Sequence, residues 1–391
     1  MAVEADLGPD LRGPERLRAS GAHVGLGRLR DGLAPTPPMG WNSWNRFQTD
    51  IDERLVRETA EAMVETGMRD AGYRYVVIDD GWVAAERTAS GDLEPNDRFA
   101  SGIPRLADAI HALGMRFGIY TDAGTRTCAG FLGSLGFEFR DARRFAEWGA
   151  DCVKIDWCNT GGLGTHAVYW KWSQAFRAAR RPMLLSVCEW GRTDPWRWAA
   201  RVGHLWRTCW DIQDTWGSLL GVLDRQRGLA PFSGPDRWND PDMLEVGNGG
   251  MTLEEYRAHF SLWCVLAAPL MAGNDVRAMP DAVREILVAP EPIAVDQDPL
   301  GRQGDLVRAD GGGEVWARDL ADGSRAVVLF DRSDAAGEVA VAWTELGWDA
   351  RDRAVVRDLW QRADVGTFAQ GYSVAVPAHA ARMLRISRVE G

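Results

Sequence analysis

Short apolar runs recur between about residues 37 and 275, each followed by a polar cluster and then by a stretch with helical spacing of apolar residues. This alternation is typical of parallel βα units. Eight strands are predicted, over residues 38–44, 73–82, 116–122, 152–157, 183–190, 204–211, 237–244 and 269–275. Eight strands with interleaved helices over roughly 250 residues are what a closed (β/α)8 TIM barrel requires.

Helix signals are clear in two of the intervening segments. Residues 52–72 carry apolar residues at helical spacing and end in Gly72, and residues 141–150 begin with Asp141, which is placed to cap a helix. From about Leu306 the pattern changes to short alternating runs, separated mostly by turns that contain Gly or Asp. The runs lie at 314–320, 324–330, 337–343, 354–360, 372–378 and 381–387. They indicate a C-terminal antiparallel β-sandwich.

The patterns predict three parts: an N-terminal extension over residues 1–34, a catalytic (β/α)8 barrel over 35–303, and a β-sandwich domain over 304–391. The extension alternates charge with Gly and Pro and lacks the apolar centre of a secretory signal. No run approaches the ~20 apolar residues of a membrane-spanning helix. We therefore expect a cytoplasmic protein, or a secreted one if a signal has been removed.

Composition narrows the classes of partner. A formal net charge of −11, with no compensating block of Lys and Arg, would repel phosphate backbones and anionic lipid head groups. Nucleic acid and membranes are not expected as partners, and a homo-oligomer stays open. The six cysteines form no CxxC pair, which argues against a zinc ribbon or a thioredoxin-like site.

Acidic residues cluster at the C-terminal ends of the predicted strands, where TIM barrels build their active sites. One such acid often only caps the next helix, but a ring of acids around one mouth indicates a site. The acids are Asp79, Asp80, Asp122, Asp156, Glu189, Asp211, Asp240 and Asp242.

Two chemistries suit so many carboxylates. One is a magnesium or calcium site; the other is glycoside hydrolysis, where one carboxylate attacks or activates water and another protonates the leaving oxygen. Of the six histidines only His204 lies in a predicted barrel strand, near its start, so zinc and iron are not expected. Tryptophans beside the acids favour a carbohydrate substrate over a metal, because aromatic faces bind sugars. They are Trp41, Trp44, Trp82, Trp157, Trp190, Trp210 and Trp238.

One of only two lysines in the chain, Lys154, lies two residues before Asp156 in an apolar run. Residues i and i+2 of a strand share a face and lie roughly 6.5 Å apart. Both side chains should therefore point into the barrel, and Ile155 toward the helices. We expect Lys154 to donate hydrogen bonds to hydroxyls and to favour an ionised Asp156 at neutral pH. The alternative is a buried ion pair kept for packing, which adds little net stability.

Nine motifs occur in order between about Pro37 and Gly304: PPMGWNSW, YVVIDDGW, GIYTDAGTRTCAG, VKIDWC, CEWGRTDP, WRTCWDIQDTW, RWNDPDMLEVGN, APLMAGND and AVDQDPLGRQG. Together they resemble the α-galactosidases of the melibiase family, which includes lysosomal and plant enzymes. The resemblance implies a retaining exo-glycosidase that releases terminal α-linked D-galactose and needs no cofactor or metal.

The resemblance also assigns roles to single residues. Asp156 matches the nucleophile and Asp211 the general acid and base, whose carboxyls should lie about 5 to 5.5 Å apart for retention. The positions that match sugar contacts are Trp44, Asp79, Asp80, Tyr120, Cys128, Lys154, Glu189, Arg207, Asp242 and Met243. Because Arg207 and Asp211 would be ~13 Å apart on an ideal strand, the chain must bend after Arg207. Cys128 and Cys158 match a disulfide in relatives, which a reducing cytoplasm would disfavour.

Two positions depart from the family pattern. Gly81 stands where many relatives have a cysteine, and Trp210 stands where relatives carry a small residue, so its indole would narrow the pocket or alter the leaving-group side. Glu189 favours a sugar with a free 2-hydroxyl over N-acetylgalactosamine. The pair Asp79 and Asp80 favours galactose over β-L-arabinopyranose. The alternatives are β-L-arabinopyranosidase or α-N-acetylgalactosaminidase activity, a non-catalytic sugar-binding barrel, and a metal-dependent hydrolase.

Overall fold

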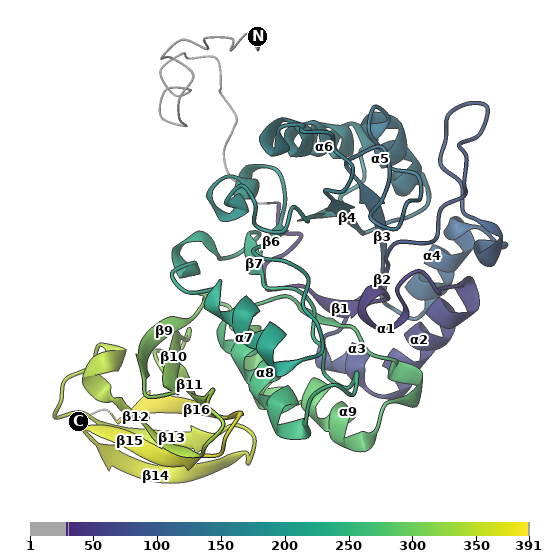
Figure 1. The fold of residues 1–391 in the computed structure, drawn as a ribbon. Coiled ribbons are helices and arrows are strands. Elements are labelled where there is room, and N and C mark those ends of the chain that lie inside the picture. The colour runs from purple at the N-terminus through teal and green to yellow at the C-terminus, as the bar shows by residue number, and fades with distance from the viewer. Residues whose placement is uncertain (1–28, 30, 390–391) are drawn as a thin grey trace, which may run out of the picture.

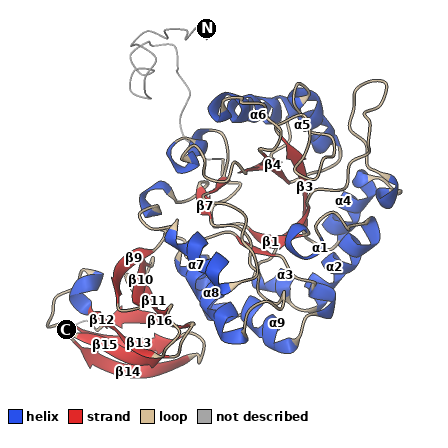
Figure 2. Ribbon diagram, viewed as in Figure 1, coloured by secondary structure: helices blue, strands red, loops and turns tan. Residues whose placement is uncertain are grey.

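The computed structural model describes residue 29 and residues 31–389 of the 391-residue chain, so most of the predicted N-terminal extension lies outside the described residues. Eight parallel strands stand inside a ring of helices, and an antiparallel sandwich lies beside that ring (Figure 1 and Figure 2). This arrangement confirms the predicted fold class. Within the described residues, no helix has the length and apolar character needed to span a membrane.

All eight predicted barrel strands form, most of them shorter than predicted. They are β1 Met39–Asn42, β2 Tyr75–Ile78, β3 Arg116–Asp122, β4 Cys152–Asp156, β5 Leu184–Val187, β6 Leu205–Arg207, β7 Trp238–Asp240 and β8 Leu270–Ala272. The strands pair in the order β7-β6-β5-β4-β3-β2-β1-β8. A parallel bridge between Leu244 and Ala272 joins the two ends of this sheet, so the barrel closes.

Helices and short turns connect the strands. The α-helices are α1 Trp44–Phe47, α2 Glu53–Glu65, α3 Met68–Ala71, α4 Ile103–Ala112, α5 Glu138–Glu147, α6 Thr165–Ala179, α7 Trp216–Asp224, α8 Leu253–Val265, α9 Asp281–Leu287 and α10 Pro290–Asp296. The 3₁₀ turns are η3 Asp97–Phe99, η4 Pro195–Arg197, η5 Ala199–Arg201, η6 Ala230–Phe232, η7 Val276–Ala278 and η8 Trp343–Leu346.

Two helix predictions are wrong in detail. The helix predicted over residues 52–72 divides into α2 and α3, because Gly67 adopts a φ of 82°, in the left-handed region. Asp141 does not cap α5; it lies inside that helix, where Phe137 holds the cap position. The Asp141 carboxylate is buried and accepts two hydrogen bonds of 2.7 Å from the Arg87 guanidinium. A buried ion pair, which spacing along the chain does not reveal, therefore determines its position.

One interleaved helix is replaced by shorter turns. In the described chain, only η4 and η5 lie between β5 and β6. Asp194 adopts a φ of 53° and Pro195 follows it as the first residue of η4. Proline at this place starts a new turn and cannot continue one, so the segment from Gly191 to Gly203 makes tight turns in place of a helix.

Successive side chains of each barrel strand point alternately toward the helices and into the barrel. Val153 and Ile155 of β4 pack toward the helices in the main core, whereas Cys152 packs inside the barrel. Lys154 lines a narrow cavity of about 50 Å³ within the barrel. The prediction that Lys154 points inward and Ile155 outward is therefore confirmed.

The C-terminal sandwich contains the six predicted strands and two more. The strands are β9 Asp305–Asp310, β10 Gly313–Asp319, β11 Arg325–Asp331, β12 Gly337–Ala342, β13 Arg353–Asp358, β14 Ala363–Ala369, β15 Gly371–Val376 and β16 Ala380–Arg388. One sheet has the order β14-β13-β16-β11-β10-β9, and β12 pairs with β15 in the other. The two extra strands, β9 and β14, are the edges of the larger sheet and are mostly exposed or half-buried, so they lack an apolar face. The domain boundary at residues 303 and 304 stays a prediction.

Candidate active site

All eight predicted acids lie at or just after the C-terminal ends of their strands. Two of them bind mainly to the backbone. Asp122 accepts hydrogen bonds from the N–H groups of Gly124 at 2.6 Å and Cys158 at 2.8 Å. Asp240 accepts one from the N–H of Asp242 at 2.9 Å. Asp122 and Asp240 thus stabilise loops, which is the simpler role expected of a single acid at a strand end.

Asp156 is the last residue of β4 and is buried. Its carboxylate accepts hydrogen bonds from the Tyr120 hydroxyl at 3.1 Å and from the N–H of Trp157 at 2.9 Å. Burial and the neighbouring carboxylates raise the pKa of Asp156, the charge of Lys154 lowers it, and the net result is a pKa of about 6. The carboxylate is therefore mostly ionised at neutral pH and takes up a proton in mild acid.

Lys154 does not form its ion pair with Asp156. Its Nζ donates a 2.8 Å hydrogen bond to Oδ2 of Asp79, and Asn42 Nδ2 donates to the same oxygen at 2.8 Å. The ammonium lies 5.3 Å from the centre of the Tyr120 ring. The alternative of a buried ion pair between Lys154 and Asp156 is therefore wrong, because Lys154 instead serves as the counter-charge of the buried Asp79. The expected sign holds, since Lys154 lowers the pKa of Asp156.

Asp80 and Glu189 are buried acids with different partners. Asp80 accepts hydrogen bonds from the N–H groups of Gly81 at 2.8 Å and Ala129 at 3.0 Å, and burial raises its pKa. Glu189 Oε2 accepts from the Thr193 N–H at 3.0 Å and hydroxyl at 3.1 Å. Its Oε1 has no hydrogen-bond partner among the described residues, and burial raises the pKa to about 7. Glu189 therefore keeps a buried acceptor that no described residue uses.

The predicted bend after Arg207 is present, because β6 ends there. Arg207 Nη2 donates to Asp211 Oδ1 at 2.8 Å, and its Nη1 lies 3.0 Å from Asp242 Oδ1. Asp242 Oδ2 accepts the N–H of Ile212 at 2.8 Å, which fixes the loop that carries Asp211. Burial raises the pKa of Asp211, but Arg207 and Lys154 outweigh it and hold the pKa below its usual value. Burial raises the pKa of Asp242 to about 7.

Met243 and Trp44 are two further predicted sugar contacts. Met243 lines the same narrow barrel cavity as Lys154 and Arg207. Trp44 begins α1 directly after β1, is half-buried, and donates its N–H to Asn42 Oδ1 at 2.8 Å. Asn42 thus orders both Trp44 and Asp79, although sequence reasoning did not select it. Its position at the C-terminal end of β1 was the available signal.

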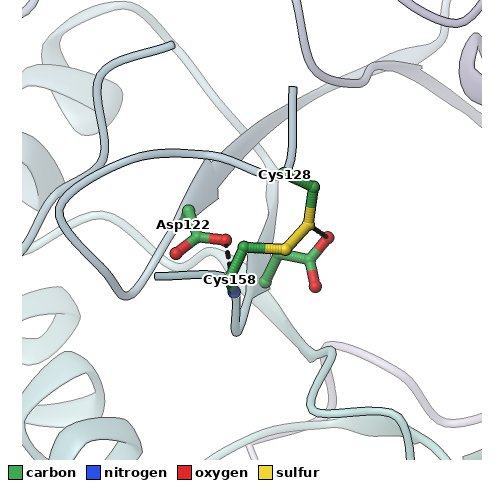
Figure 3. A group of neighbouring side chains, drawn as sticks. Asp122, Cys128 and Cys158 are labelled. Atoms are coloured by element: carbon green, nitrogen blue, oxygen red, sulfur yellow. Dashed lines mark hydrogen bonds between the residues drawn. A yellow bond between two sulfur atoms is a disulfide. The ribbon is translucent and has the colours of Figure 1, made fainter. Parts of the chain in front are cut away.

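Cys128 and Cys158 form a disulfide with Cα atoms 5.2 Å apart, which joins the loop after β3 to the loop after β4 (Figure 3). The Cys128 sulfur lies 3.6 Å from Asp156 Oδ2; because a disulfide sulfur has no proton, this is a packing contact. Potential ligand atoms of these three residues and Asp122 all lie within 4.8 Å of one another. A metal ion would need thiolates here, and the disulfide removes them.

Gly81 explains one departure from the family pattern. Its φ is 104°, and a Cβ added there would lie 2.9 Å from the Cα of Thr49. Glycine fits this close approach without strain, whereas a larger residue would require the backbone to move.

An open depression of about 450 Å³ adjoins the disulfide. Trp157 and Trp190 line it together with Arg192, whose guanidinium lies 4.6 Å from the Trp190 ring centre. A larger cavity of about 640 Å³ lies between α8, α9 and the C-terminal strands, and its lining contains none of the eight acids. The ring of acids, rather than this larger cavity, is therefore the candidate active site.

Comparisons with known proteins cover nearly the whole chain. A family model described as alpha galactosidase A matches residues 36–298, and a model of the alpha galactosidase C-terminal beta sandwich domain matches residues 310–386. An α-galactosidase of Cyamopsis tetragonoloba is 43% identical over 98% of this chain and 94% of its own length. An α-N-acetylgalactosaminidase of Gallus gallus is 38% identical over 85% and 88%. The crystal structure of α-galactosidase I from Mortierella vinacea has a TM-score of 0.89 and 35% identity, covering 92% of this chain and 98% of that one.

Proposed function

The chain belongs to the α-galactosidase family and is a glycoside hydrolase, and from this premise we propose that it releases terminal α-linked D-galactose by double displacement. The observation that carries the proposal is the arrangement of two aspartates. Asp156 is buried against the Tyr120 hydroxyl, and Asp211 is held by Arg207 at the outer end of the same site.

In the first step Asp156 attacks the anomeric carbon and the bond to the leaving oxygen breaks, while Asp211 gives that oxygen its proton. In the second step Asp211 takes a proton from water, the water oxygen bonds to the anomeric carbon, and the ester to Asp156 breaks. Tyr120 and the N–H of Trp157 hold the Asp156 oxygens in position for attack. The two carboxyls should lie about 5 to 5.5 Å apart.

Asp211 must be protonated when the substrate is bound, yet Arg207 and Lys154 hold its pKa below the usual value. The Asp211 side chain is 58% exposed, so a bound sugar displaces water from it. Loss of that water disfavours the charged form and raises the pKa. Substrate binding therefore favours the protonated acid that the first step requires.

The residues proposed to contact the sugar favour galactose over N-acetylgalactosamine and β-L-arabinopyranose as the substrate. Lys154 and Asp79 offer a donor and an acceptor held in one ion pair, and Glu189 keeps Oε1 free to accept a 2-hydroxyl. By the family resemblance, Glu189 would leave no room for an N-acetyl group at that position. Asp79 and Asp80 would bind the far side of the ring, including the 6-hydroxymethyl group that β-L-arabinopyranose lacks.

The test compares nitrophenyl α-D-galactoside with nitrophenyl β-L-arabinopyranoside and nitrophenyl α-N-acetylgalactosaminide. Wild type should prefer the galactoside, and Asp156→Asn should lose on the order of 10³-fold or more in kcat. NMR of the first product should show the retained anomer. Near-normal turnover by the variant would show that Asp156 is not the nucleophile, and a product of inverted anomeric configuration would exclude double displacement. Chelation should leave the activity unchanged. Loss of activity after chelation would instead indicate a metal-dependent hydrolase.

A further inference from the structure

Trp210 is an exposed aromatic residue beside the proposed acid. It directly precedes Asp211 in the loop after β6, and 50% of its surface is exposed. Of the tryptophans in the described part of the chain it has the largest exposed fraction, whereas Trp41, Trp206 and Trp238 are fully buried. An indole left in water gives up the burial that stabilises most tryptophans, so its position suggests a ligand.

The Trp210 ring is held in place on one side. Its Cζ2 lies 3.3 Å from where a Cβ at Gly221 would stand, so the indole edge packs close to α7. The Arg225 guanidinium, just after α7, lies 6.0 Å from the ring centre. A ring that is already positioned loses little conformational freedom when it binds a ligand.

The chemistry of the site places the leaving group near this ring. Asp211 has to reach the glycosidic oxygen, which joins galactose to the rest of the substrate. Galactose occupies the buried side, where Lys154 and Asp156 lie, so the rest of the substrate lies on the exposed side of Asp211. Consecutive Cα atoms are about 3.8 Å apart, and an indole is longer than that. The Trp210 ring can therefore lie beside a group that is bound at Asp211.

We propose that Trp210 is a specificity-determining residue that stacks on the sugar ring attached to the departing oxygen. The substrate class is then an oligosaccharide or polysaccharide in which galactose is linked to another pyranose. This inference rests on the proposed function. The apolar face of a pyranose covers the exposed face of the indole, and the glycosidic oxygen then lies at the Asp211 carboxylate.

The open depression lined by Trp157, Trp190 and Arg192 is a competing place for the leaving sugar. It adjoins the disulfide and the loop after β4, on the side of Asp156. Trp210 lies instead in the loop that carries the proton donor. An experiment on Trp210 therefore separates the two positions.

The experiment measures kcat and KM on a galactosyl disaccharide and on α-galactosyl fluoride, whose leaving group has no ring. Trp210→Ala should lower kcat/KM for the disaccharide about 10-fold, mainly through KM, and leave the fluoride unchanged. Trp210→Phe should recover most of the loss, since it restores an aromatic face. Phe139→Ala, at an equally exposed position on α5, should change neither substrate.

Three outcomes overturn the inference. An equal loss on both substrates shows that Trp210 acts on Asp211, and no loss shows that Trp210 does not contact the leaving sugar. A disaccharide that quenches tryptophan fluorescence equally in wild type and Trp210→Phe shows that the ring is not covered. Failure of wild type on both substrates would instead refute the proposed function. Circular dichroism of each variant checks that the fold is intact.

Discussion

At the residue scale, two cations set the charge of the acids in the site. Lys154 pairs with Asp79, and Arg207 is shared by Asp211 and Asp242. Asp156 is buried and has its pKa raised to about 6. Asp211 contacts the Arg207 guanidinium and has its pKa lowered. Environments that push two carboxyl pKa values apart are a feature of acid and nucleophile pairs.

Lys154→Gln should shift the pH dependence of kcat/KM toward higher pH. Asp156 acts when ionised, so activity is lost as the pH falls through its pKa of about 6. Without the lysine charge that pKa rises, and the acidic limb of the profile moves up with it. The variant also leaves Asp79 buried without its counter-charge, which costs about 3 kcal/mol of unfolding free energy. The pH profile and urea unfolding measure the two effects.

The chain's other lysine provides the control. Lys171 Nζ lies 2.6 Å from Glu138 Oε2, on the outer helices α6 and α5. Lys171→Gln should leave the pH profile unchanged. If Lys154→Gln reduced activity equally at every pH, the lysine would contribute to substrate binding without tuning Asp156.

At the element scale, the disulfide joins the loops after β3 and β4 beside Asp156. Cys158→Ser should therefore loosen both loops and lower kcat about 10-fold, because misplacement of the nucleophile is costly. Opening a cross-link across a separation of 30 residues should also lower the unfolding free energy by about 3 kcal/mol. Kinetics and urea unfolding measure these changes.

Reduction of the wild type with dithiothreitol should produce the same loss. The double variant Cys128→Ser, Cys158→Ser should not respond to the reductant, since the other four cysteines are free and buried. A wild type that keeps full activity after confirmed reduction would show that the strands alone hold Asp156 in place.

The elements that could be predicted are those with an apolar face. Strand β4 could be placed because Val153 and Ile155 alternate with inward residues, whereas the edge strands β9 and β14 expose most of their residues and leave no such pattern. The rim acids could be predicted because barrel strands bring their C-terminal ends together. The partner of Lys154 could not be predicted. Spacing along β4 shows which face of the strand Lys154 occupies, but Asp79 is 75 residues away in sequence.

At the scale of the whole molecule, buried contacts tie the sandwich to the barrel. Arg318 of β10 is buried, and its Nη1 donates to the carbonyl oxygens of Cys264 at 3.0 Å and Asp296 at 3.2 Å. Trp360 Nε1 donates to Ser261 Oγ of α8 at 2.9 Å. Because these groups lose their partners if the parts separate, we expect barrel and sandwich to unfold together.

His379 adds a pH-dependent contact to this junction. Its Nδ1 lies 2.8 Å from Glu255 Oε1 of α8, its Nε2 lies 2.9 Å from Asp334 Oδ1, and its ring stacks on Trp216 of α7. Burial lowers the pKa of His379, but the two carboxylates outweigh it, so the pKa lies above the usual value. Only the doubly protonated ring can donate to both acids.

His379→Gln should destabilise the protein in mild acid and have less effect in alkali. Because the pKa of His379 is higher in the folded protein than the unfolded value of about 6.5, protonation of His379 stabilises the folded state. This stabilisation is complete below a pH of about 6.5 and is lost as the pH rises through the folded-state pKa. Solvent screening limits the effect to about 0.5 kcal/mol, or roughly 0.5 to 1 °C in Tm for a chain of 391 residues. Tm measured from pH 5.5 to 8.5 should show the gap between wild type and variant closing. His166, whose pKa burial lowers, supplies the control: His166→Gln should give a slope of opposite sign. A gap for His379→Gln that stays constant with pH would mean that stacking on Trp216, without the charge, holds the two parts together.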